Sequence, residues 1–150
     1  MEISNTIEIR NTPEKIFYWL EDPSRAMEWM TSVSKTEIIK ETPNMVGTTF
    51  RELLEENGRG TEMRGVVTDF VSNKRLAFHL EGEFNSVEVN YTLQEKGEIT
   101  QLSQNAEIQF KGLLRVLSVL FSPIFKKKIK NQARREFAKL KELCERDVQY

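Results

Sequence analysis

Three polar residues interrupt apolar faces of the predicted β-strands, and they are the first candidates for chemistry. Glu52 lies between Phe50 and Leu54 in an alternating segment, and Tyr91 and Gln104 occupy apolar positions of two later segments. A carboxylate on a buried face must be paired, be hydrated or have a raised pKa. Glu52 could therefore anchor a ligand, or act with Tyr91 as a general acid or base. The alternative is a strand end, a bulge or a salt bridge at the edge of the sheet.

Other residue types that carry catalysis are scarce in this chain. His79 is the only histidine. It alternates with the apolar residues Phe78 and Leu80, so the pattern predicts that it lies on the polar, solvent-facing side of its strand. A typical zinc site needs several ligands, and Cys144 lies far along the chain. The sequence has no glycine-rich phosphate loop, no G-x-S-x-G elbow and no Cys/His nucleophile motif. We therefore expect no metal, no cofactor and no nucleophilic enzyme.

Composition and charge narrow the class of protein. The 150 residues are 39% hydrophobic and 30% charged, which is typical of one globular domain over residues 1–150. The formal net charge of -1 argues against nucleic acid as a partner. A single cysteine excludes an intrachain disulfide and fits a reducing compartment. The chain has no signal-like start and no apolar run of about 18 residues, so we expect a cytoplasmic protein.

Period-two alternation predicts the strands that position these residues. The chain opens with such a segment over residues 3–9, and residues 36–40 form another. Asn57-Gly58 and Lys96-Gly97 are typical of tight hairpin turns that set the register of the strands around them. One face of the later strands is apolar and the other is polar. This division predicts an antiparallel sheet with one buried face.

Three prolines mark the starts of helices. Pro13, Pro23 and Pro123 each follow a Thr, Asp or Ser, which is the pattern of an N-cap followed by proline at the first helical position. Two short helices are therefore predicted over residues 13–20 and 23–30, and a long helix from Pro123.

The C-terminal segment has an apolar stripe at helical spacing, which Pro123 divides into a short helix and a long one. The long helix is the only predicted element large enough to cover the apolar face of the sheet. The stripe consists of Leu113, Leu117, Leu120 and Ile124, and then Ile129, Ala133, Phe137, Leu140 and Cys144.

Both ends of the chain resemble a known superfamily. The run from Thr12 to Pro23 with Glu28-Trp29-Met30, and the run from Gly112 to Pro123 with the basic helix up to Leu143, resemble the START-like (SRPBCC) superfamily of polyketide cyclase/dehydrase and lipid-transport type. The resemblance implies an α+β helix-grip fold, in which a curved antiparallel sheet of about six to seven strands wraps around the long C-terminal helix. It also implies a cavity between sheet and helix.

We expect this cavity to bind a small hydrophobic ligand, such as a lipid, an isoprenoid or quinone, or a polyketide-like compound. A non-catalytic carrier or sensor is the first hypothesis. A cyclase or dehydratase that uses Glu52 and Tyr91 is the second, and a co-chaperone-like interaction module is the third, because this fold hosts all three. The expected lining is Trp29, Phe50, Glu52, Leu54, Met63, Leu76, Phe78, Val89, Tyr91, Leu102, Gln104, Phe125 and Ile129.

A basic run near the start of the long helix has two interpretations. It could be a solvated helix face, balanced by Glu136, Glu142 and Glu145. It could also contact an anionic membrane surface, because basic residues near anionic lipid contribute about 1 kcal/mol each. The lysines concerned are Lys126, Lys127, Lys128 and Lys130, with Arg134 and Arg135 beyond them.

Overall fold

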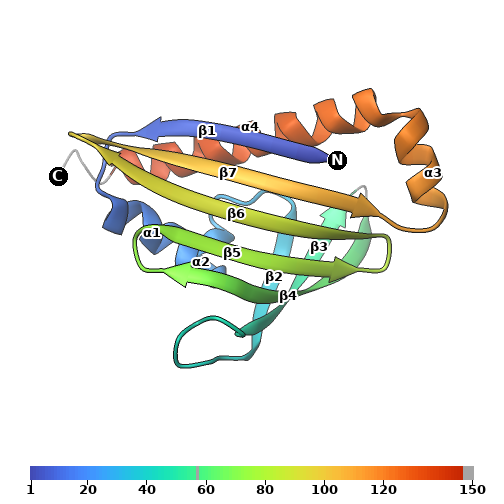
Figure 1. Cartoon of the computed structure of the whole chain (residues 1–150), viewed down its shortest axis with the longest axis horizontal. Coiled ribbons are helices and arrows are strands. Elements are labelled where there is room, and N and C mark those ends of the chain that lie inside the picture. Colours follow the sequence, from blue (N-terminus) through green and yellow to red (C-terminus); the bar gives the residue numbers. More distant parts are fainter. Residues whose placement is uncertain (57, 147–150) are drawn as a thin grey trace.

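The computed structural model describes residues 1–56 and 58–146, and these form one curved sheet that packs against a long C-terminal helix (Figure 1). The α+β helix-grip fold is confirmed. In chain order the elements are β1 (Glu2–Ile9), α1 (Pro13–Glu21), α2 (Pro23–Ala26), β2 (Val33–Lys40), β3 (Thr49–Glu56), β4 (Arg59–Val71), β5 (Arg75–Gly82), β6 (Asn85–Lys96), β7 (Ile99–Phe110), α3 (Leu113–Leu120) and α4 (Ser122–Arg146).

The strands pair in the order β1-β7-β6-β5-β4-β3-β2, and every pairing is antiparallel. β2 to β7 form a meander, and β1 adds an edge strand by pairing with β7, where Ile3 faces Ala106. The long helix α4 runs across this sheet (Figure 1). Since side chains alternate between the two faces, the register decides which residues point toward α4.

Tight turns fix that register. Lys96 faces Ile99, so two residues connect β6 and β7, and Gly97 takes the positive φ of 67° that this turn requires. Glu56 faces Arg59 across the β3–β4 connection, and Gly58 has φ 78°. The other predicted turn residue, Asn57, lies outside the described residues.

The two early helices begin where the prolines predict. The Thr12 hydroxyl accepts a hydrogen bond from the Lys15 amide at 3.4 Å, and this cap starts α1. The helix predicted over residues 23–30 is wrong in length, because α2 ends at Ala26. Beyond it the chain turns, and the Trp29 indole donates a hydrogen bond to the Trp19 carbonyl oxygen at 2.9 Å. The Met30 amide still donates to the Ala26 carbonyl oxygen at 2.9 Å, so one turn continues beyond the end of α2.

Pro123 separates two helices, as predicted. In α4 the stripe is buried at Phe137, Leu140 and Cys144, where the helix packs on the sheet. The upstream part of the stripe is helical, but none of the residues of α3 is buried. α3 lies beyond the end of β7, at the opposite end of the molecule from α1 and α2 (Figure 1). Within residues 1–56 and 58–146, no helix combines the length and the apolar content needed to cross a bilayer.

Candidate functional site

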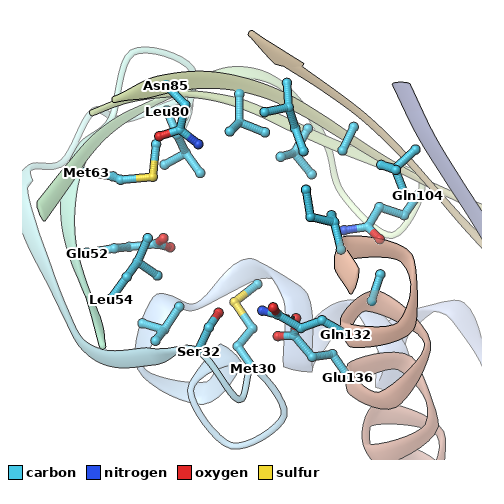
Figure 2. A pocket seen from close by; sticks show the side chains of 18 of the residues that line it. Met30, Ser32, Glu52, Leu54, Met63, Leu80, Asn85, Gln104, Gln132 and Glu136 are labelled. Atoms are coloured by element: carbon cyan, nitrogen blue, oxygen red, sulfur yellow. Dashed lines mark hydrogen bonds between the residues drawn. The ribbon is translucent and has the colours of Figure 1, made fainter. Parts of the chain in front are cut away.

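A cavity of about 370 Å³ lies between the concave face of the sheet and α4 (Figure 2). Its wall is mostly apolar and is contributed by strands β1 to β7, the segment after α2, and one face of α4. Nine of the thirteen residues expected at such a cavity lie on its wall: Trp29, Glu52, Leu54, Met63, Phe78, Val89, Tyr91, Gln104 and Ile129.

The other four expected residues do not lie on the wall. Phe50, Leu76 and Leu102 are buried in the packed core. The Phe50 ring lies over Gly65, whose missing side chain leaves the space that it fills, and meets the ring of Phe78 at 5.7 Å. The Phe125 ring packs instead on the ring of Phe110, at a centroid distance of 6.2 Å. Phe50, Leu76 and Leu102 lie on the predicted face of their strands, but they belong to the packed core and not to the cavity wall.

Several polar residues on the wall of the cavity were not predicted from the sequence as lining residues. Gln132 and Glu136 point into the cavity from α4, on the side facing Glu52 of β3 (Figure 2). The interpretation of Glu136 as part of the solvated helix face is therefore wrong. A signal was available, because Glu136 is seven residues after Ile129 and shares its face of the helix. The further polar residues on the wall are Ser32, Asn85 and Lys128.

Glu52 has the most strongly perturbed carboxyl group of the cavity. Its side chain points inward, and the residue is 8% exposed (Figure 2). Burial, and to a smaller extent the nearby charge of Glu136, raises the pKa of Glu52 from 4.5 to about 7. Among the described residues none donates a hydrogen bond to this carboxyl. Its two oxygens are therefore available to a ligand.

Glu136 is half-buried, and unlike Glu52 its carboxylate accepts hydrogen bonds from neighbouring residues. The Thr31 amide donates to one of its oxygens at 3.1 Å, and the Gln132 amide donates to the other at 3.3 Å. Burial raises the pKa of Glu136, while these hydrogen bonds act in the opposite direction because they favour the carboxylate. The two acidic residues therefore differ, with Glu136 held by donors and Glu52 lacking them.

Tyr91 places a phenol at the cavity wall beside Gln104. The Gln104 amide donates a hydrogen bond to the phenolic oxygen at 3.1 Å, so the phenolic proton remains available for an acceptor in the cavity. Burial, and then the charges of Glu136 and Glu52, raise the pKa of Tyr91 further above its ordinary value. The ring contacts those of Trp29 and Phe137 at centroid distances of 6.3 and 6.4 Å, and these contacts fix its direction.

His79 lies on the opposite face of the sheet, as its parity predicts. Its two ring nitrogens hydrogen-bond the carboxylates of Glu81 and Glu88. These hydrogen bonds raise the pKa of His79 above 6.5, and the bond with Glu81 contributes most. In the described part of the chain, no group of three or more His, Cys, Asp or Glu side chains is placed to hold a metal ion.

The family of the chain follows from its sequence as a whole. The model of the family described as polyketide cyclase/dehydrase and lipid transport matches residues 1–145. The chain belongs to this family. Members of the polyketide cyclase/dehydrase and lipid transport family include enzymes as well as transport proteins by that description. No curated protein matches the sequence.

Several solved structures share the fold of this chain. The Zhui aromatase/cyclase from Streptomyces sp. R1128 has a TM-score of 0.82 and 11% identity, over 99% of this chain and 95% of that chain. A START superfamily protein from Mycobacterium smegmatis has a TM-score of 0.80 and 17% identity, over 97% of both chains. A protein from Thermus thermophilus has a TM-score of 0.81 and 16% identity, over 96% of this chain and 97% of that chain. At these identities the likeness shows the fold alone.

Proposed function

We propose that this member of the polyketide cyclase/dehydrase and lipid transport family binds one small, mainly apolar molecule in its cavity, as a non-catalytic carrier or sensor. The observation that carries the proposal is the cavity itself. Its volume of about 370 Å³ falls within the range of roughly 300–1,000 Å³ of small-molecule sites. Its wall is apolar apart from a few polar groups. Such a wall favours ligands whose apolar surface is removed from water on binding.

The polar groups define the orientation of the ligand. Tyr91 has a proton to donate, and Glu52, with a pKa of about 7, has both protonation states at neutral pH. A hydroxyl or carbonyl group of the ligand therefore finds an acceptor or a donor, while the rest of the molecule contacts apolar side chains. Lipids, isoprenoids or quinones, and polyketide-like compounds all have this division between an oxygenated end and an apolar body.

A matched pair of variants on α4 tests the proposal. Ala133 is on the cavity wall, whereas Ala138 is exposed on the same helix. Ala133→Phe fills part of the cavity and should abolish uptake of an apolar fluorescent probe, and Ala138→Phe should leave uptake unchanged. Thermal unfolding of both variants establishes that they are folded. Equal uptake by the two variants would contradict binding in this cavity.

A cyclase or dehydratase reaction is the second candidate function. Glu52 and Tyr91 support it, because proton transfer to a bound substrate needs an acid or a base whose pKa lies near the working pH. The aromatase/cyclase among the similar folds is in line with it. If a polyketide-type substrate is turned over, Glu52→Gln should abolish turnover while leaving probe uptake in place. Turnover that persists in Glu52→Gln would remove Glu52 from the mechanism.

A further inference from the structure

The helix α3 exposes an apolar surface that the cavity does not explain. Leu113, Val116 and Leu120 follow the spacing i, i+3 and i+7 along one side of this helix. Large exposed apolar patches on proteins mark interaction sites. We call the following residues, whose exposed fractions run from 47% to 75%, the α3 apolar surface: Leu113, Val116, Val119, Leu120, Phe121 and Ile124.

The charged residues of the chain segment that carries this surface are of one sign, although Lys111 at its start is paired with Glu81 of β5 at 2.6 Å. The segment from Lys111 to Arg135 contains eight basic residues and no acidic residue. The other 14 basic and 23 acidic residues give the rest of the chain a net charge of -9. Lys126 and Lys127 are exposed and lie within six residues of Phe121, and Arg115 is exposed within α3. Positive charge is thus concentrated in the segment that contains the exposed apolar helix, and Arg115, Lys126 and Lys127 lie nearest to it in the chain.

The geometry points to α3 and the start of α4 as a docking surface for an anionic lipid bilayer. An interfacial helix places its apolar side chains among the acyl chains while lysines and arginines contact the anionic headgroups, and both parts are present on this segment. A second copy of the chain fits this surface less well. A two-fold symmetric contact through α3 would bring two segments of eight basic residues together.

The position of the docking surface relates it to the cavity. α3 follows β7 directly, and Phe110 at the end of β7 lies on the cavity wall. Its ring packs on that of Phe125, which contacts the ring of Phe121 at 6.5 Å. A row of three rings therefore leads from the cavity to the α3 apolar surface. If the proposed ligand binding holds, docking would bring this end of the cavity to the bilayer.

Vesicle flotation tests the docking directly. Phosphatidylcholine vesicles with phosphatidylserine should bind the protein, vesicles of phosphatidylcholine alone should bind it far less, and added salt should weaken binding to the anionic vesicles. Each lysine near an anionic surface contributes a factor of about five, so Lys126→Gln with Lys127→Gln should weaken binding about 25-fold. The matched control is Lys74→Gln, at an exposed position in the β4–β5 turn.

A second pair of variants tests the apolar contribution. Val116→Glu with Leu120→Glu removes two apolar contacts and adds two negative charges, and should reduce binding at least about tenfold. Ile39→Glu makes the same kind of change at an exposed apolar position on β2 and should leave binding unchanged. Because all of these side chains are exposed, the variants are expected to fold, and thermal unfolding measures this.

Three results would overturn the docking proposal. They are equal binding to both kinds of vesicle, binding that neither pair of substitutions weakens, and a dimer in gel filtration that Val116→Glu with Leu120→Glu converts to a monomer. Probe uptake is measured on the same proteins. If the wild type takes up the probe but does not bind anionic vesicles, the docking proposal fails and the ligand proposal stands. If it binds anionic vesicles but takes up no probe, the ligand proposal fails and the docking proposal stands.

Discussion

Glu52→Gln should remove a pH dependence of stability that the cavity imposes on this protein. The pKa of Glu52 is about 7 in the folded protein and has its ordinary value of 4.5 in the unfolded chain. Because the folded pKa is the higher one, the group stabilises the fold fully below pH 4.5. That stabilisation is lost as the pH rises through 7, and the loss levels off at about pH 8.

The magnitude follows from the size of the pKa shift. One pKa unit corresponds to about 1.4 kcal/mol, so a shift from 4.5 to about 7 changes the free energy of unfolding by about 3 kcal/mol. The residue is 8% exposed, so solvent screens this effect little. Glutamine keeps the shape of the side chain and does not ionise. The variant should therefore resemble the wild type near pH 4.5 and exceed it by about 3 kcal/mol at about pH 8.

Urea unfolding across this pH range measures the difference. Glu55→Gln is the matched control, because Glu55 is exposed on the same strand. The difference between the Glu52→Gln variant and the wild type should grow with pH, whereas the difference for the control should stay nearly constant. A constant difference for both variants would refute the reasoning, since it would mean that the Glu52 carboxyl is hydrated or paired in solution.

Two further predictions concern the sheet. Gly65→Ala should destabilise the fold by about 1–3 kcal/mol in urea unfolding, because its Cβ would lie 2.2 Å from the Phe50 ring. The control is Gly60→Ala, which should be nearly neutral because no atom lies within 4 Å of the added Cβ. Equal effects of the two substitutions would contradict this packing. In an NMR titration the single histidine, His79, should show a pKa above 6.5 that Glu81→Gln lowers, and an unchanged pKa would exclude the hydrogen bond.

Much of the sheet could be predicted from the sequence, because the alternation that marks a strand lies within a few consecutive residues. Alternation with a period of two placed Glu52, Tyr91 and Gln104 on the face that α4 covers, and the structure has them there. The same alternation could not separate the cavity wall from the core. Phe50 and Leu54 have the same parity on β3, but only Leu54 lies on the wall. That distinction depends on packing between strands, because the Phe50 ring lies over Gly65 of β4 and against Phe78 of β5, and alternation within one strand does not specify such contacts.

Two misses have physical reasons that differ. Glu136 shares a helix face with Ile129, but its charge favoured an assignment to solvent, and only the folded chain brings the Thr31 amide to its carboxylate. The helix predicted over residues 23–30 ends at Ala26, and beyond it Trp29 is buried with its indole bonded to the Trp19 carbonyl oxygen, a contact that helix propensity does not contain. In both cases a contact between distant residues decided the outcome.

Native mass spectrometry of the protein purified from its own host, followed by denaturing mass spectrometry of the released small molecule, tests the central claim most directly. The account predicts one apolar molecule per chain, with an oxygenated end and a size suited to a cavity of about 370 Å³. It also predicts that Ala133→Phe, purified in the same way, lacks this molecule. A wild-type protein that is empty and takes up no apolar probe would contradict the proposed binding site.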